Sequence, residues 1–243
     1  AFLLGDWEKD REIYMEIPKG WAKYYPPGSV LKLLKTVYGG KQSAKRYWIK
    51  LLEVMDKMNF ARSQADPCLY YQWHPEFGLI VMLSWVDDIC IAGTKAGVEH
   101  TKKEFFKHFD CEDTGEMKEY VGNKVERKDG MLKITQPILL QSFVDEFKFD
   151  RDQKVKNPAI PGTVLHPTEV KLSNEDLFTF RSGTGKLLHL MKWSRPEIGN
   201  AVRELSRYMS GAGLSHLKAM YRVINYCLNT SERGKVFKPR RNC

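Results

Sequence analysis

The sequence predicts an α+β protein, with antiparallel hairpins in its first part and mainly helices in its second. Two apolar, β-branched-rich runs, at residues 79–85 and 89–92, flank an acidic pair and are bounded by glycines, which is the pattern of a buried hairpin. The dipeptide Asp129-Gly130 marks a second hairpin. Beyond residue 170, apolar side chains recur at helical spacing. Hairpins and helices are therefore mixed, without a regular β-α-β alternation.

The other strands of the first part are predicted from short alternating or apolar runs bounded by turn residues. They are expected at residues 12–17, 68–73, 120–126 and 131–135. Helical spacing predicts helices that begin after the turn at residues 38–43 and at residue 95, and Ser43 is the expected N-cap of the first. The second helix is expected to turn four side chains inward: Val98, Phe105, Phe106 and Phe109.

A proline-rich connection precedes the second part. Residues 150–170 contain Pro158, Pro161 and Pro167, and such a stretch indicates a linker over which few contacts pass. We therefore expect two domains, at residues 1–135 and 136–243. The helices of the second part are expected at residues 139–147, 178–191, 196–209 and 215–228.

The net charge of +9 belongs to the C-terminal part of the chain. Residues 1–150 hold 22 Lys and Arg against 23 Asp and Glu, whereas residues 151–243 hold 17 against 7. A polyanion such as nucleic acid would explain this excess, and a solvated basic surface without a partner is the alternative. Paired cations at i, i+4 spacing on two helices are candidates for contacts with a phosphate backbone: Arg203, Arg207, Lys218 and Arg222.

The composition argues against several kinds of site. The five cysteines are widely and irregularly spaced, so neither a disulfide framework nor a zinc site is indicated. The six histidines show no ligand spacing, which leaves carboxylates as the candidate metal ligands. The longest apolar run is too short to span a bilayer, and an intracellular protein without a membrane partner is expected.

Asp87 and Asp88 are the strongest candidates for chemistry. Their flanking strands are nearly continuously apolar, whereas a surface hairpin would alternate, so both carboxylates are expected close to the interior. A charge placed there requires a partner, and a divalent cation is the obvious one. The alternative is that aspartates at a tight turn serve only local backbone hydrogen bonding. At the glycine turn, a helix amino end with Lys41 and Gln42 favours a phosphate site.

Several motifs of the chain match one known family. Trp85-Val86-Asp87-Asp88 resembles the Tyr-x-Asp-Asp hairpin of reverse transcriptases. Further motifs lie over essentially the whole chain, at residues 1–6, 14–20, 33–42, 120–122, 194–198 and 205–209. In their order and spacing they resemble the reverse transcriptase of copia-type LTR retrotransposons. The resemblance implies a right-hand polymerase, with an antiparallel-sheet palm that carries the acids, a fingers segment, and a largely helical thumb or connection.

The resemblance also implies nucleotidyl transfer with two Mg²⁺ ions, Mn²⁺ being an alternative, for which Asp87 is a ligand and Asp88 a ligand or a support. The implied partners are an RNA or DNA template-primer, deoxynucleoside triphosphates, and the RNase H and integrase regions of the same polyprotein. The implied location is the cytoplasm, in virus-like particles, or the nucleus.

Other roles carry over motif by motif. Phe2 matches the aromatic under the incoming sugar that excludes a 2′-hydroxyl, while Lys41 and Gln42 match a segment near the nucleotide and template. Trp85 would touch the primer end. The primer grip would include Tyr120, Val121 and Gly122. The alternatives are core aromatics for Phe2 and Trp85, a helix cap for Gln42 and a strand bend for Gly122.

The chain departs from the family at three points. Trp85 stands where the family usually has Tyr, and Gly40 stands where it usually has Leu. The family's first catalytic Asp lies four residues ahead of the position matching Ala1, so the two-metal site is expected to be incomplete. We therefore expect a polymerase that is inactive as this fragment. The alternatives are a catalytically dead nucleic-acid-binding remnant and a metal-dependent nuclease that uses the same acidic pair.

Overall fold

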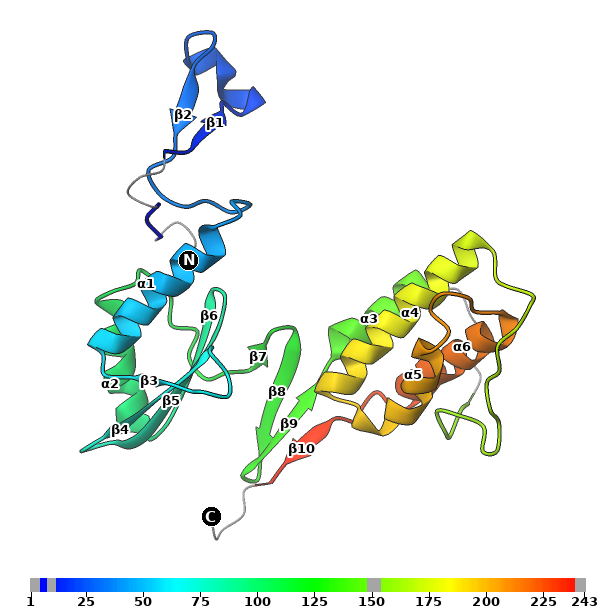
Figure 1. Ribbon diagram of the computed structural model, residues 1–243. Helices are drawn as coiled ribbons and strands as arrows, with labels where there is room; N and C mark the ends of the chain where they lie inside the picture. The colour runs from blue at the N-terminus through cyan, green and yellow to red at the C-terminus, as the bar shows by residue number, and fades with distance from the viewer. Residues whose placement is uncertain (1–4, 8–11, 148–153, 239–243) are drawn as a thin grey trace. The chain divides into compact units, whose positions relative to one another are not determined.

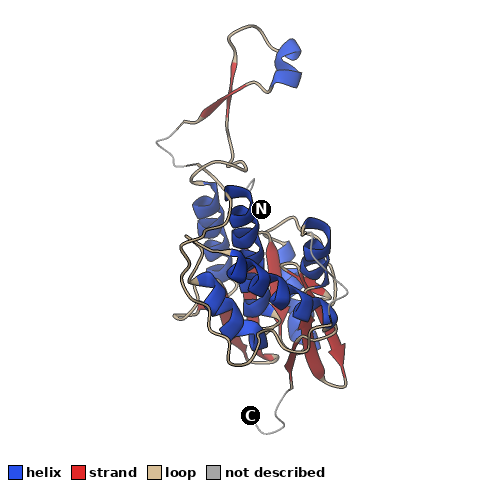
Figure 2. Cartoon of the chain, turned by 90° about the vertical axis from the view of Figure 1, so that its right-hand side faces the viewer, coloured by secondary structure: helices blue, strands red, loops and turns tan. Residues whose placement is uncertain are grey.

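The computed structural model describes residues 5–7, 12–147 and 154–238. These residues form helices and sheets, and every strand pair among them is antiparallel (Figures 1 and 2). The expected α+β class with antiparallel sheets is confirmed. The chain divides into two compact units, residues 1–115 and 116–243.

The sheet of the first unit has the strand order β3-β4-β5-β6. Its strands are β3 (Ala61–Arg62), β4 (Leu69–His74), β5 (Gly78–Trp85) and β6 (Asp88–Ala92). Because side chains alternate across a strand, one face of β5 buries Ile80 and Met82. Two helices pack Leu51 and Phe105 into the same core and cover this face, α1 (Ser43–Lys57) and α2 (Lys95–Phe106) (Figure 1). Two of the α2 side chains that are expected to point inward differ: Phe105 is buried, but Phe106 is exposed.

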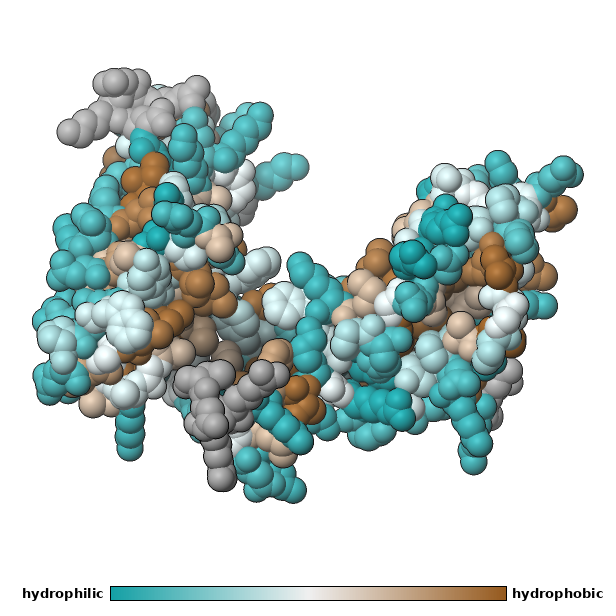
Figure 3. All heavy atoms as spheres, turned by 60° about the horizontal axis from the view of Figure 1, so that its bottom comes forward, coloured by the Kyte–Doolittle hydropathy of each residue, from teal (hydrophilic) through white to brown (hydrophobic). Residues whose placement is uncertain are grey.

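The other face of this sheet is only partly covered. Leu79 and Trp73 are 41% and 73% exposed, respectively. The nearly continuous apolar run of β5 therefore consists of one buried face and one partly exposed face. Apolar side chains reach the surface among hydrophilic ones (Figure 3).

A small hairpin precedes α1 in the first unit. Strand β1 (Tyr14–Glu16) pairs with β2 (Val30–Lys32), and the 3-10 helix η2 (Lys19–Tyr24) lies between them in the chain (Figure 2). The predicted strand at residues 12–17 thus forms over its central residues.

The sheet of the second unit has the order β10-β9-β8-β7. Its strands are β7 (Glu119–Tyr120), β8 (Asn123–Lys128), β9 (Met131–Thr135) and β10 (Lys235–Phe237). The Asp129-Gly130 hairpin is confirmed, with φ of 52° and 72°, as in a type I′ turn. The predicted single strand at residues 120–126 is wrong, because Val121 and Gly122 form another turn with both φ positive.

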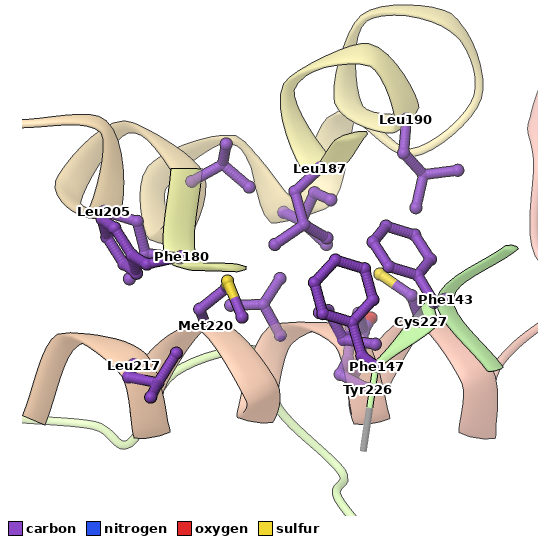
Figure 4. Packing of buried hydrophobic residues seen from close by; sticks show 14 of the residues in the cluster. Phe143, Phe147, Phe180, Leu187, Leu190, Leu205, Leu217, Met220, Tyr226 and Cys227 are labelled. Atoms are coloured by element: carbon purple, nitrogen blue, oxygen red, sulfur yellow. The ribbon is translucent and has the colours of Figure 1, made fainter. Parts of the chain in front are cut away.

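Four helices build the core of the second unit. They are α3 (Pro137–Glu146), α4 (Asn174–Trp193), α5 (Gly199–Ser206) and α6 (Leu214–Asn229). Phe143, Phe180, Leu187 and Met220 are fully buried between them (Figure 4). The predicted helix at residues 196–209 is shorter, because a 3-10 turn, η3 (Pro196–Ile198), precedes α5.

The division between the units differs from the predicted boundary at residue 135. Strand β10 pairs with β9, so the sheet that begins at β7 belongs with the helices. The proline-rich stretch also makes contacts in this unit: Val155 is buried, and its N–H donates to Asn229 Oδ1 at 2.8 Å. The hydroxyl of Tyr208 donates to the carbonyl of Leu165 at 2.6 Å. None of the described helices has the length and hydropathy needed to cross a bilayer.

Candidate active site

The acidic pair lies at the tip of the β5–β6 hairpin. Trp85 pairs with Asp88, so Val86 and Asp87 form a two-residue turn. Val86 has a φ of 52°, which is strained for a β-branched side chain. A positive φ at the first turn position alone is the pattern of a type II′ turn, which usually has glycine there.

Both carboxylates are exposed, so the expectation that they lie close to the interior is wrong. Ser84 is the last buried residue of β5, and Trp85 beyond it is 54% exposed. The reason is that the apolar run covers one packed face only, and the hairpin continues past the core. Trp85 is therefore not a core aromatic, and it lies opposite Asp88 in the hairpin.

Tyr38 connects the glycine loop to this tip. Its hydroxyl donates to Asp87 Oδ2 at 2.6 Å, and this hydrogen bond raises the pKa of Tyr38 above its usual 10.0. On α1, burial and then the negative charge of Asp87 raise the pKa of Tyr47 to about 12. The sequence places Tyr38 within the matched motif at residues 33–42 but indicates no role for it.

The glycine loop turns tightly before α1. Gly39 has a φ of 90°, and a Cβ on Gly40 would lie 2.5 Å from Ser43 Oγ and 3.3 Å from the Val37 carbonyl oxygen. The Ser43 hydroxyl donates to that carbonyl at 2.6 Å. Ser43 is therefore the first residue of the helix and not its N-cap, which corrects the prediction; Gln42 holds the N-cap position.

Lys41 and Gln42 follow Tyr38 in this loop. Lys41 is exposed. The Gln42 side chain makes no capping hydrogen bond to the helix, which argues against the helix-cap alternative. Its Oε1 atom is buried and finds no hydrogen-bond partner among the described residues. The loop thus brings a cation and an unpaired amide oxygen into the segment whose Tyr38 contacts the acidic tip.

The ligand set for divalent ions is incomplete in the part of the chain that the structure describes. No group of three or more Asp, Glu, His or Cys side chains is arranged there for a metal ion. Asp87 already accepts the Tyr38 hydrogen bond through one oxygen. Two exposed carboxylates on adjacent residues do not enclose two ions, so the described residues do not fit a complete two-metal site.

The expected primer-grip residues form the tight turn between β7 and β8. Val121 and Gly122 have φ of 49° and 72°, and the Asn123 side-chain amide donates to the Tyr120 and Val121 carbonyls at 3.0 and 3.1 Å. Gly122 is thus a turn residue and not a strand bend. This turn belongs to the second unit. Phe2 lies outside the described residues.

The candidate phosphate-binding cations also belong to the second unit. Arg203 and Arg207 both pair with Glu204, at 3.3 and 2.9 Å, so their charges are partly compensated. On α6, Lys218 is exposed, whereas Arg222 is half-buried. The Arg222 Nε atom is buried and has no hydrogen-bond partner in the described ranges.

Comparison with known proteins gives one family and several relatives. Residues 1–161 match the family described as "Reverse transcriptase (RNA-dependent DNA polymerase)". The "Retrovirus-related Pol polyprotein from transposon TNT 1-94" of Nicotiana tabacum is 30% identical over 95% of this chain and 18% of its own length. The "Retrovirus-related Pol polyprotein from transposon RE1" of Arabidopsis thaliana is 28% identical over 98% of this chain and 16% of its own length.

With one yeast relative, the match covers a larger share of the relative's own length. The "Putative transposon Ty5-1 protein" of Saccharomyces cerevisiae is 23% identical over 91% of this chain and 72% of its own length. The chain spans less than a fifth of the two plant polyproteins. No solved structure matches the chain significantly.

Proposed function

The chain belongs to the reverse transcriptase family, and from this premise we propose that it carries out RNA-directed DNA synthesis as part of a copia-type retrotransposon polyprotein. The resemblance to copia-type elements that the motifs indicate is confirmed by the relatives. The exposed Asp87-Asp88 tip carries the proposal, because carboxylates that act on a primer end and a nucleotide must be accessible to both.

The acidic tip would supply two of the oxygen ligands for Mg²⁺ or Mn²⁺. A further ligand has to come from outside the described residues, since none of those present joins the pair. The family resemblance implies that this ligand is an Asp of the family's first motif, so we propose that the 243-residue chain alone is inactive and that a protein extended to include that motif is active.

The nucleotide would lie against the glycine loop. The exposed Lys41 ammonium suits a triphosphate, and Gln42 follows it in the same loop. In the right-hand arrangement that we propose, the β3-β4-β5-β6 sheet is the palm, the segment with β1 and β2 belongs to the fingers, and the helices of the second unit form the thumb and connection. The β7–β8 turn would then serve as the primer grip.

Primer extension on an RNA template with Mg²⁺ tests the proposal. An upstream-extended protein should extend the primer, and Asp87→Asn should reduce its rate by at least about a thousandfold, since removing one group of a catalytic unit removes most of its effect. Asp129→Asn is the matched control, because Asp129 also lies in a two-residue hairpin turn and Asn tolerates its positive φ. A folded extended protein that is inactive, or that keeps its activity with Asn at position 87, would end the proposal.

An inactive nucleic-acid-binding remnant is the second candidate. The incomplete ligand set and the 17 Lys and Arg against 7 Asp and Glu in residues 151–243 favour it. It predicts that template-primer affinity falls steeply with salt. Neutral substitution of four cations should flatten that dependence: Arg203, Arg207, Lys218 and Arg222. A flat salt response in the unmodified chain would exclude this candidate.

A further inference from the structure

The chain between β1 and β2 exposes two aromatic rings on a short helix. Helix η2 has no buried residue, and Trp21 and Tyr24 are 60% and 66% exposed. Side chains three residues apart lie on the same side of a 3-10 helix. The two ring centroids are 5.8 Å apart with planes tilted by 53°. The rings therefore do not stack face to face on each other, and both remain available to a planar partner.

Positive charge accompanies the rings. The Lys23 ammonium lies 4.9 Å from the centroid of the Tyr24 ring, and Lys19 begins the same helix. Neither lysine forms an ion pair with any residue that the structure describes, whereas Lys32 of β2 is paired with Glu12. The two lysines that have no acidic partner thus lie on the same short helix as the exposed rings.

We propose that these four residues, Lys19, Trp21, Lys23 and Tyr24, form a binding surface for single-stranded RNA, which we name the η2 surface. Exposed aromatic rings receive unpaired bases by stacking, and adjacent cations follow the backbone. A duplex offers its stacked bases no access to such rings. An apolar protein partner would not require the two lysines, so the charge favours the nucleic acid.

The inference rests on the proposed polymerase function only for the identity of the strand, which would be the unpaired part of the RNA template. The contact itself involves neither Asp87 nor Asp88. Binding and synthesis can therefore fail independently, and separate measurements distinguish them.

Fluorescence anisotropy with a labelled oligouridine and the 243-residue chain tests the η2 surface. Replacing Trp21 or Tyr24 with alanine should each weaken binding about tenfold, since base stacking on one ring contributes that much. Changing Lys19 and Lys23 to glutamine should reduce the salt dependence of binding. None of the four side chains is buried, so thermal melts of all variants should match the unmodified chain.

Trp73→Ala is the matched control, because Trp73 is 73% exposed but lies on β4. It should leave the affinity for oligouridine unchanged. Equal losses from Trp73→Ala and Trp21→Ala, or unchanged affinity after Trp21→Ala and Tyr24→Ala, would overturn the η2 surface. An affinity for a blunt RNA duplex that falls after Trp21→Ala as much as the affinity for oligouridine does would also overturn it.

Sedimentation velocity tests the alternative that the η2 surface binds a second copy of the chain. A dimer that Trp21→Ala dissociates, with RNA affinity unchanged, would assign the surface to self-association and refute the proposal. Loss of oligouridine binding in the Trp21 and Tyr24 variants, together with an extended protein that fails in primer extension, would support the η2 surface while refuting the polymerase function. Asp87→Asn should leave oligouridine binding intact.

Discussion

Tyr38 donates a hydrogen bond from its hydroxyl to Oδ2 of Asp87 at 2.6 Å, which joins the glycine loop to the acidic hairpin across 49 residues of sequence. The bond fixes the orientation of a carboxylate that is otherwise exposed at the end of a turn. Side chains that hold a ligand or catalytic carboxylate in this manner contribute by positioning.

Tyr38→Phe removes the hydroxyl and keeps the ring. Primer extension by the upstream-extended protein should fall about tenfold, because the Asp87 carboxylate loses its orienting partner. The melting temperature should not change, since Tyr38 is exposed. Steady-state extension rates and a thermal melt measure the two effects. A variant that loses rate and stability together would indicate a structural role for Tyr38.

Titration of the phenol examines the same bond without catalysis. Hydrogen bonding to Asp87 raises the pKa of Tyr38 above 10.0, because the bond favours the protonated phenol. The difference in ultraviolet absorbance between the unmodified chain and Tyr38→Phe isolates this group. With Asp87→Ala in both proteins, the pKa should fall toward 10.0. An unchanged titration would show that the bond does not form in solution.

Val86→Gly should stabilise the hairpin. A left-handed φ costs a β-branched residue about 1–2 kcal/mol, whereas glycine adopts it freely and loses about 0.5–1 kcal/mol through its more flexible unfolded state. The free energy of unfolding in urea should therefore rise by about 0.5 kcal/mol.

Val236→Gly is the control for this change. Val236 and Val86 are both 49% exposed, but Val236 lies in strand β10 and lacks a positive φ. Its replacement should lower the free energy of unfolding by about 1 kcal/mol, since only the entropic cost and lost packing remain. Destabilisation by both substitutions to the same extent would mean that the turn at Val86 is not strained.

The sequence identified the acidic hairpin but not its environment. The glycines and apolar runs predict two strands and a turn, and these form. A continuous apolar run does not reveal whether both faces are covered, however, and Leu79 is 41% exposed beside the fully buried Ile80. The burial of Asp87 and Asp88 was mispredicted for this reason.

Other features depend on contacts that no local pattern contains. The Tyr38 to Asp87 bond joins distant residues, and its signal was only the position of Tyr38 before Gly39 in a matched motif. Strand β10 has three residues and forms because β9 offers an edge. The type I′ turn at Val121 and Gly122 could not be predicted, since asparagine and not valine is the usual residue before the glycine of such a turn.

Arg195→Lys should strongly destabilise the second unit. The Arg195 guanidinium is 1% exposed, donates to the Cys227 carbonyl at 3.3 Å and to the Thr230 carbonyl and hydroxyl at 3.1 and 2.6 Å, and pairs with Glu197 at 2.6 Å. It therefore provides hydrogen-bond donors for carbonyl groups at the C-terminal end of α6. Lysine cannot make these bonds together, so a loss of about 3 kcal/mol in the free energy of unfolding is expected.

Arg233→Lys is its counterpart, because both guanidinium groups lie over the Tyr226 ring, at 5.5 Å for Arg195 and 5.9 Å for Arg233. Arg233 is exposed, and its replacement should cost less than about 0.5 kcal/mol. Urea unfolding followed by circular dichroism measures both. Arg233 also donates to the Tyr226 hydroxyl at 2.8 Å. Losses of equal size would show that contacts with Tyr226, and not the buried hydrogen bonds to Cys227 and Thr230, are what Arg195 contributes.

His216 should make stability depend on pH. It is fully buried, its Nδ1 accepts the Gly213 N–H at 2.9 Å, and its ring centroid lies 4.1 Å from that of Tyr208. Burial lowers the pKa of His216 below its usual 6.5 because the charged ring is poorly solvated there. Acceptance of the Gly213 hydrogen bond also requires an unprotonated Nδ1.

As the pH falls through 6.5, the His216 ring of the unfolded chain therefore takes up a proton, whereas the ring of the folded chain stays neutral until a lower pH. The stabilisation is present above that pH and is lost as the pH falls through 6.5 toward the lowered pKa of the folded state. Urea unfolding should give a lower free energy at about pH 5.5 than at about pH 7.5. His216→Gln keeps an acceptor and does not titrate, so its difference between the two pH values should be smaller. An equal pH dependence in both proteins would assign the effect to other groups, because the only change between them is the titrating ring.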